Sequence, residues 1–244
     1  GGHRMLIKNV RLLAELSDGC KADHGFVRVE DGKITEVSVE ELLPLAEEEV
    51  FDAAGKTLLP GLIDLHTHIT LLGGVGENSK NEPMQLLIDA AAQAKRYLKY
   101  GFTTIRDCGS YERAATYVRN MIRMGLCEGP NLIACGNTLA SSATMKEGYL
   151  LDGELGFTVG ARKEAAYGAD FIKIYASGSA YNPTGVPLNP IMTREEIRAA
   201  VDTARVNGLY VAAHCHADEA VRACIECGVR TIEHATYISD ATTD

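Results

Sequence analysis

The chain has 244 residues, of which 46% are hydrophobic and 23% are charged. This is the composition of an ordinary globular protein, and it argues against a largely disordered, fibrous or collagen-like chain. The formal net charge of -9 disfavours a nucleic-acid-binding face, and no apolar run approaches the roughly 18 residues that a membrane-spanning helix needs. The seven cysteines are scattered and odd in number, which favours reduced thiols in a cytoplasmic protein over a disulfide framework.

Residues 5–57 have the pattern of a small β domain. Short apolar stretches bounded by turn residues predict strands over 5–13, 25–30, 33–37 and 49–51. Asp31-Gly32 lies between two of these strands and is a strong signal for a β-hairpin. The stretch 40–49 is acidic and weakly patterned, so we expect it to be a connector.

Residues 58–244 form the second predicted domain, in which strands alternate with helices. Strands are expected over 62–69, 102–108, 131–135, 171–176, 210–215 and 231–236, and helices over 84–100, 112–125, 160–167, 193–207 and 218–227. This alternation is typical of the α/β class with a parallel sheet. A TIM-type (β/α)8 barrel takes about 250 residues, or roughly 31 for each βα unit. Residues 61–244 number 184, which fits a barrel of which about six βα units are present. An open doubly wound sheet fits the same strands equally well.

Histidines stand at the ends of three predicted strands. His66 and His68 close the first, His214 and His216 close the fifth, and His234 closes the sixth. Because residues i and i+2 of a strand share a face, His66 and His68 point the same way. The carboxyl ends of parallel barrel strands meet at the rim that carries the active site, and imidazole suits zinc and neighbouring divalent metals. The alternative is a set of surface or core histidines, and their clustering at strand ends favours a metal site.

Lys173 stands in the otherwise apolar fourth strand, which we expect to be buried on both faces. An unpaired ammonium is costly there, so the pKa of the lysine is expected to fall toward the neutral amine. A neutral amine can react with carbon dioxide to give a carbamate, which could bridge two metals. The alternative is a lysine that extends along the strand to reach solvent at the rim. The residues alone leave both open.

Several segments resemble those of the amidohydrolase superfamily. Residues 60–68 (Pro-Gly-Leu-Ile-Asp-Leu-His-Thr-His) resemble its first-strand signature, and residues 168–175 its fourth-strand lysine segment. Similar matches, in family order, occur at 101–107, 129–133, 211–214 and 232–234. The resemblance covers about residues 5–240. Within the superfamily it is strongest to the prolidase-like and arginine/lysine carboxypeptidase-like metallopeptidases.

The resemblance implies a centre of two divalent metals, with zinc the expected ion. His66 and His68 would hold one metal and His214 and His234 the other, with carboxylated Lys173 bridging them. The remaining candidates surround these ligands: Tyr175 and His216 would contact substrate or pack at the rim, and Asp64 would orient a ligand or serve in packing or capping. Asp107 is expected to be a structural hydrogen-bonding residue.

The family's eighth strand ends in an aspartate that binds metal and moves a proton. Asp240 and Asp244 directly follow the sixth predicted strand and cannot take that place. We therefore expect this chain to be a fragment of a longer one that supplies the catalytic aspartate.

The resemblance predicts a metal-dependent amidohydrolase that cleaves an amide or peptide bond with a hydroxide shared by the two metals. A small molecule or a dipeptide is the expected substrate, with no nucleic-acid or membrane partner, and formation of a homo-oligomer stays open. Two alternatives remain. One is a non-catalytic or truncated metal-binding remnant of the fold, and the other is a cyclic amidase, lactonase or phosphoesterase that uses the same metals.

Overall fold

The computed structural model describes residues 3–71, 82–142, 150–179 and 189–243. Contacts within the chain divide it into two compact units, Gly1–Gly61 and Leu62–Asp244. No helix in the described ranges is both long enough and apolar enough to cross a membrane.

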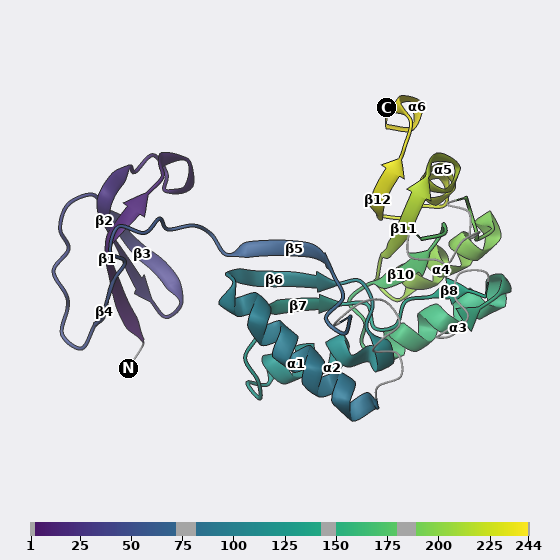
Figure 1. Ribbon diagram of the computed structural model, residues 1–244, viewed down its shortest axis with the longest axis horizontal. Coiled ribbons are helices and arrows are strands. Elements are labelled where there is room, and N and C mark those ends of the chain that lie inside the picture. The colour runs from purple at the N-terminus through teal and green to yellow at the C-terminus, as the bar shows by residue number, and fades with distance from the viewer. Residues whose placement is uncertain (1–2, 72–81, 143–149, 180–188, 244) are drawn as a thin grey trace. The chain divides into compact units, whose positions relative to one another are not determined.

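The first unit is a four-stranded sheet with the order β3-β2-β1-β4 (Figure 1). Its strands are β1 (Arg4–Leu12), β2 (Ala22–Glu30), β3 (Lys33–Ser38) and β4 (Glu49–Asp52), with the short 3-10 turn η1 (Ala14–Leu16) after β1. β1 pairs with β2, and β2 with β3, in antiparallel fashion, whereas β4 runs parallel to β1. The predicted hairpin is confirmed: Asp31 and Gly32 have φ angles of 50° and 75° and connect β2 to β3, as a tight hairpin turn requires.

The acidic connector between β3 and β4 is anchored to the sheet by one buried carboxylate. Arg28 Nε on β2 donates to Glu48 Oε1 at 2.8 Å, and the Leu45 N–H donates to Glu48 Oε2 at 2.9 Å. The side chain of Glu48 is fully buried, and its hydrogen bond with Arg28 lowers the pKa of the carboxyl although desolvation acts in the opposite direction. The Arg28 guanidinium also donates to the carbonyl of Leu43 at 2.9 Å, so this ion pair fixes a stretch that has little regular structure of its own.

The second unit contains two three-stranded parallel sheets, β5-β6-β7 and β10-β11-β12 (Figure 1). Their strands are β5 (Leu62–Thr67), β6 (Phe102–Asp107), β7 (Asn131–Ala134), β10 (Ile172–Tyr175), β11 (Val211–Ala217) and β12 (Thr231–Tyr237). Leu139, shortly after β7, forms a parallel bridge with Ile174 and links the two sheets. The predicted α/β class and the six predicted strands are confirmed. The expected barrel is not: within the described ranges the sheets are open, and no strand pairing joins β12 back to β5.

Helices alternate with these strands as predicted. They are α1 (Pro83–Lys99), the 3-10 turn η3 (Tyr111–Arg113), α2 (Ala114–Arg123), α3 (Gly153–Ala166), α4 (Arg194–Val206), α5 (Asp218–Glu226) and α6 (Asp240–Thr243), and the short strands β8 (Ala140–Ser141) and β9 (Leu150–Leu151) precede α3. Thr193 and Glu196 form the reciprocal capping box that starts α4, with hydrogen bonds of 3.2 and 2.9 Å.

The predicted start of α3 was wrong, because the helix begins at Gly153 rather than near residue 160. Glycines 153, 156 and 160 lower the intrinsic helix propensity of this segment. Packing overrides that propensity: Phe157 is fully buried, and at Gly160 a Cβ atom would lie only 2.4 Å from Leu151 Cδ1. Glycine is therefore used here for close approach of the helix to β9.

Two of the apolar clusters lie between the strands and the helices. Ile172 and Ile174 of β10 pack in a cluster with residues of α3, α4 and α5, and Ile105 and Leu132 pack with α1 and α2. Figure 1 shows α1 and α2 along one face of the β5-β6-β7 sheet. Because strand residues alternate between faces, Lys173 projects away from the α-helical layer.

Candidate metal centre

All five strand-end histidines converge on one site. The ring centroids of His66 and His68 on and after β5 are 5.2 Å apart, and His66 lies 4.7 Å from His234 on β12. His234 is in turn 4.6 Å from His214 and 5.0 Å from His216, both on β11, and the last two are 4.6 Å apart. Strands that are distant in sequence thus bring five imidazoles together, as their positions at parallel strand ends predict.

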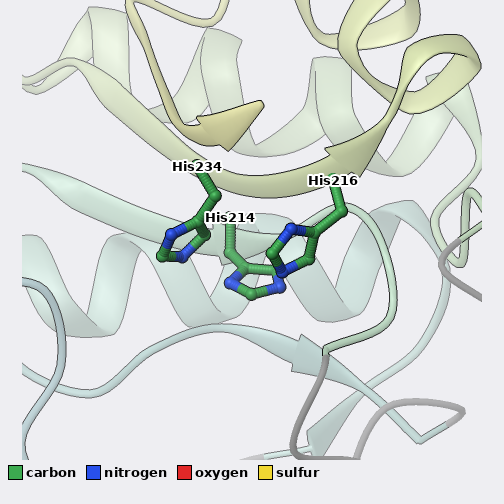
Figure 2. A group of neighbouring side chains, drawn as sticks. All are labelled: His214, His216 and His234. Carbon is green, nitrogen blue, oxygen red and sulfur yellow. The ribbon is translucent and has the colours of Figure 1, made fainter. Parts of the chain in front are cut away.

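Three of these rings form a compact group of potential ligands. Figure 2 shows His214 and His216 from β11 and His234 from β12 directed toward one another. One ring nitrogen from each lies within 4.8 Å of the others. Imidazole nitrogens in this number suit zinc and related divalent ions. His216 was expected to contact substrate or to pack at the rim, and its ring lies 4.6 Å from that of His214 and 5.0 Å from that of His234.

Hydrogen bonds to backbone carbonyls orient two of the rings. His68 Nδ1 lies 2.8 Å from the Gly109 carbonyl oxygen, and His214 Nε2 lies 3.2 Å from that of Gly178. Because a carbonyl oxygen only accepts, each of these nitrogens carries the proton and the other ring nitrogen keeps its lone pair. Each imidazole thus offers one free nitrogen, as a metal ligand must.

The site favours neutral imidazoles. Burial, followed by the positive charge of Lys173, lowers the pKa of His68 to about 4, that of His214 to about 3 and that of His234 to about 4. For His234 the neighbouring His66 contributes more than Lys173 does. Unprotonated histidines are the form that binds metal.

Lys173 is fully buried beside the histidines, and its Nζ has no hydrogen-bond partner among the described residues. The nitrogen lies 5.2 Å from the centroid of the Tyr175 ring. Burial lowers the pKa of the lysine, as the apolar strand predicts. The alternative in which the ammonium reaches solvent is wrong. A buried polar atom without a partner is uncommon in proteins, and conversion to a carbamate would replace this unpaired amine with a group whose oxygens can bind metal ions.

Glu233 enters the site although the sequence analysis did not single it out. Its Oε2 lies 2.8 Å from His66 Nδ1, and its Oε1 accepts a hydrogen bond of 2.7 Å from Arg106 Nη2. Burial acts to raise the pKa of Glu233, but the hydrogen bond with His66 and the charge of Arg106 outweigh it and lower the pKa to about 2. The available signals were an acidic residue next to the histidine of β12 and an arginine near the end of β6.

A second group of potential metal ligands consists of His66, Cys108 and Glu233, whose ligand atoms lie within 4.8 Å of one another. Both carboxylate oxygens of Glu233 are already hydrogen-bonded. Burial raises the pKa of the Cys108 thiol to about 12, and a thiol binds metal as its thiolate. This group is therefore less suited to an ion than the histidines are.

The remaining predicted residues lie at the edge of this cluster. Asp64 accepts a hydrogen bond of 3.1 Å from the backbone N–H of His66, so the carboxylate contacts the strand and not the imidazole ring. The Tyr175 ring lies 4.6 Å from that of His214, and burial raises the pKa of its phenol to about 12. Asp107 is fully buried and accepts from Ser110 Oγ at 2.7 Å and from the Ile69 N–H at 2.8 Å, which is the structural role expected of it.

Comparison with known proteins links these features to a family. The family model described as "Amidohydrolase family" matches residues 57–243. An uncharacterized protein of Mycobacterium tuberculosis is 30% identical over 197 residues, which cover 80% of this chain and 48% of that protein. Ochratoxinase of Aspergillus niger is 25% identical over 217 residues, which cover 75% of this chain and 44% of the enzyme. The chain thus spans about half the length of the curated relatives it matches.

Two solved hydrolase structures are also similar to this chain. A Xaa-Pro dipeptidase with methionine bound in its active site superposes with a TM-score of 0.86 at 27% identity, over 99% of this chain and 64% of the dipeptidase. A prolidase in complex with N-methylphosphonate-L-proline superposes with a TM-score of 0.84 at 28% identity, over 98% of this chain and 62% of that structure.

Proposed function

Because the chain belongs to the amidohydrolase family, we propose that it hydrolyses an amide or peptide bond at a centre of divalent metal ions. The observation that carries this proposal is the convergence of five histidines around a fully buried lysine that has no hydrogen-bond partner among the described residues. The prolidase, the Xaa-Pro dipeptidase and the ochratoxinase among the similar proteins support an amide-bond substrate. A dipeptide or another small molecule with an amide group is the substrate class we propose.

The proposed ligand set divides the histidines between two ions, with zinc as the proposed metal. His66 and His68 share one strand end and would hold the first ion, and His214 and His234 would hold the second. Lys173 would lie between them as a carbamate: its neutral amine forms an N–C bond to carbon dioxide and releases one proton. The lowered pKa of Lys173 supports this step, and the carbamate would place two oxygens that can bind metal ions where the unpaired amine now ends.

Divalent ions bound here would lower the pKa of a water molecule and polarise the carbonyl group of the substrate. The chain's own residues prepare the site for this chemistry. The carbonyls of Gly109 and Gly178 hold His68 and His214 in fixed tautomers. Burial raises the pKa of the Tyr175 phenol from 10 to about 12, so the phenol keeps its proton and can donate a hydrogen bond to a substrate oxygen or nitrogen. We propose that Tyr175 and His216 contact the substrate.

Metal analysis and hydrolysis assays test this proposal. The chain is stripped of metal with a chelator and titrated with Zn²⁺, and the bound zinc is measured by elemental analysis. Because the chain spans about half the length of the curated relatives it matches, hydrolysis is assayed with a longer protein that contains this chain and the family's proton-transferring aspartate, on a panel of Xaa-Pro dipeptides, N-acyl amino acids, lactones and phosphodiesters. We expect about two equivalents of zinc and hydrolysis confined to amides. Absence of tight zinc binding would overturn the proposal. Zinc binding without amide hydrolysis would favour a non-catalytic metal-binding protein. Preferred cleavage of lactones or phosphodiesters would favour a lactonase or phosphoesterase that uses the same metals.

A further inference from the structure

Two consecutive residues of β12 both lie close to His66 in the histidine cluster. Glu233 Oε2 lies 2.8 Å from His66 Nδ1, and the His234 ring lies 4.7 Å from the His66 ring. In a regular strand, neighbouring residues point to opposite faces. The convergence of both side chains on His66 therefore needs a local departure from strand geometry.

The backbone of β12 provides that departure. His234 and Ala235 have φ angles of 78° and 46°, a left-handed conformation that non-glycine residues rarely adopt. The pairing with β11 is irregular at the same point, since Cys215 pairs with His234 but the next pair is Ala217 with Tyr237. The extra residue in β12 is typical of a β-bulge, which redirects side chains and is common beside active sites.

We propose that Glu233 is a positioning residue for the metal centre, holding the His66 ring so that Nε2 faces the bound ion, and that the bulge at His234 and Ala235 exists to bring both Glu233 and His234 into the site. This inference rests on the proposed function. An ionised carboxylate can only accept, so His66 Nδ1 donates and Nε2 keeps the lone pair. Carboxylates that accept from a metal-bound histidine fix both its tautomer and its orientation.

Glu233 is itself held rigidly by its other oxygen. Glu233 Oε1 accepts from Arg106 Nη2 at 2.7 Å and from Thr231 Oγ1 at 2.9 Å. Leu65 is the residue before His66, and its carbonyl accepts a hydrogen bond of 2.6 Å from Arg106 Nε. The side chains of Arg106 and Glu233 are only 9% and 7% exposed, so solvent screens this pair little. Arg106 thus connects the backbone of β5, which carries His66, with the carboxylate on β12 that contacts the His66 ring.

The test compares two variants that remove a buried, arginine-paired carboxylate while preserving its shape. Glu233→Gln alters the residue beside His66. The matched control is Glu164→Gln, because Glu164 is also fully buried and accepts from Arg113 at 2.7 and 2.9 Å. The metal-free full chain and each variant are titrated with Co²⁺ in competition with a chromogenic chelator, and the visible spectrum of the bound Co²⁺ is recorded.

We expect Glu233→Gln to weaken Co²⁺ binding about 10–100-fold and to change the Co²⁺ spectrum, as loss of a carboxylate behind a metal-bound histidine does. Glu164→Gln should change neither, even where it lowers the thermal midpoint. Binding and spectrum equal to wild type in folded Glu233→Gln would overturn the positioning role alone. If Glu233→Gln does not fold, Thr231→Val replaces it: a smaller weakening in the same direction supports the inference, and unchanged binding overturns it. No Co²⁺ binding by the wild-type chain would instead overturn the proposed function.

Discussion

Replacing Lys173 with methionine is expected to stabilise the metal-free protein while it abolishes loading with two ions. Lys173 is fully buried and its Nζ has no hydrogen-bond partner among the described residues. A buried polar group without a partner costs about 1–3 kcal/mol, and methionine has a similar length with no polar nitrogen at its end. For a folded unit of this size each kcal/mol moves the thermal midpoint by about 2–4 °C, so the metal-free Lys173→Met variant should melt about 2–12 °C above the wild type.

Thermal unfolding of the chelator-treated proteins by circular dichroism measures this difference, and elemental analysis after incubation with Zn²⁺ measures the loading. Lys99→Met is the matched control because Lys99 is exposed on α1, and it should change the stability by less than about 0.5 kcal/mol. After incubation with Zn²⁺ the order should reverse, since only the wild type gains the stabilisation of bound metal. A Lys173→Met variant that is less stable than the metal-free wild type, or that still binds two zinc ions, would refute the reasoning.

Further predictions concern the histidines, the first unit and helix α3. His214→Ala should lose about one equivalent of zinc by elemental analysis, whereas His216→Ala should keep its zinc and raise KM; the reverse pattern would assign the ligand role to His216. Glu48→Gln should lower the free energy of unfolding by about 1–3 kcal/mol at pH 7, because the Arg28 guanidinium loses its buried carboxylate partner and keeps the more exposed Glu36. Since the folded-state pKa of Glu48 is lowered from 4.5, the wild type should lose this advantage as the pH falls below about 4.5, and denaturant titrations from pH 7 to 3 that show a constant difference would contradict it. Gly160→Ala should destabilise by about 1–3 kcal/mol through overpacking, whereas Gly156→Ala, whose added Cβ would have its nearest neighbour at 3.5 Å, should stabilise α3 by up to about 1 kcal/mol. Equal thermal midpoints for the two glycine variants would contradict that packing argument.

The convergence of the histidines could be predicted from the sequence because it depends on local rules. His66 and His68 share a face because they are two residues apart in an extended segment. Parallel strands then bring the ends of β5, β11 and β12 to one side of the sheets, where the five histidines meet. Lys173 could be predicted as buried for a similar reason, since isoleucines surround it in β10 and pack against the helices.

The role of Glu233 could not be predicted in this way, because it depends on contacts between distant strands. Its partners are Arg106 on β6 and His66 on β5, and period-two alternation would place Glu233 on the face opposite to His234. The left-handed backbone at His234 and Ala235 accounts for the approach of both side chains to His66. Neither residue is a glycine, the residue type that would have signalled such a conformation in the sequence. The early start of α3 was missed for a related reason, since tertiary packing at Phe157 outweighs the glycines that disfavour a helix there.

The central claim is that the histidine cluster and Lys173 together hold two metal ions. Anomalous diffraction at the zinc absorption edge, from crystals of the chain reconstituted with Zn²⁺ and bicarbonate, tests it most directly. We predict two anomalous peaks about 3.5–4 Å apart, one beside His66 and His68 and one beside His214 and His234, joined by density that continues from Lys173 Nζ as a carbamate. An unmodified amine at Lys173 with no anomalous peak among the histidines would contradict the account.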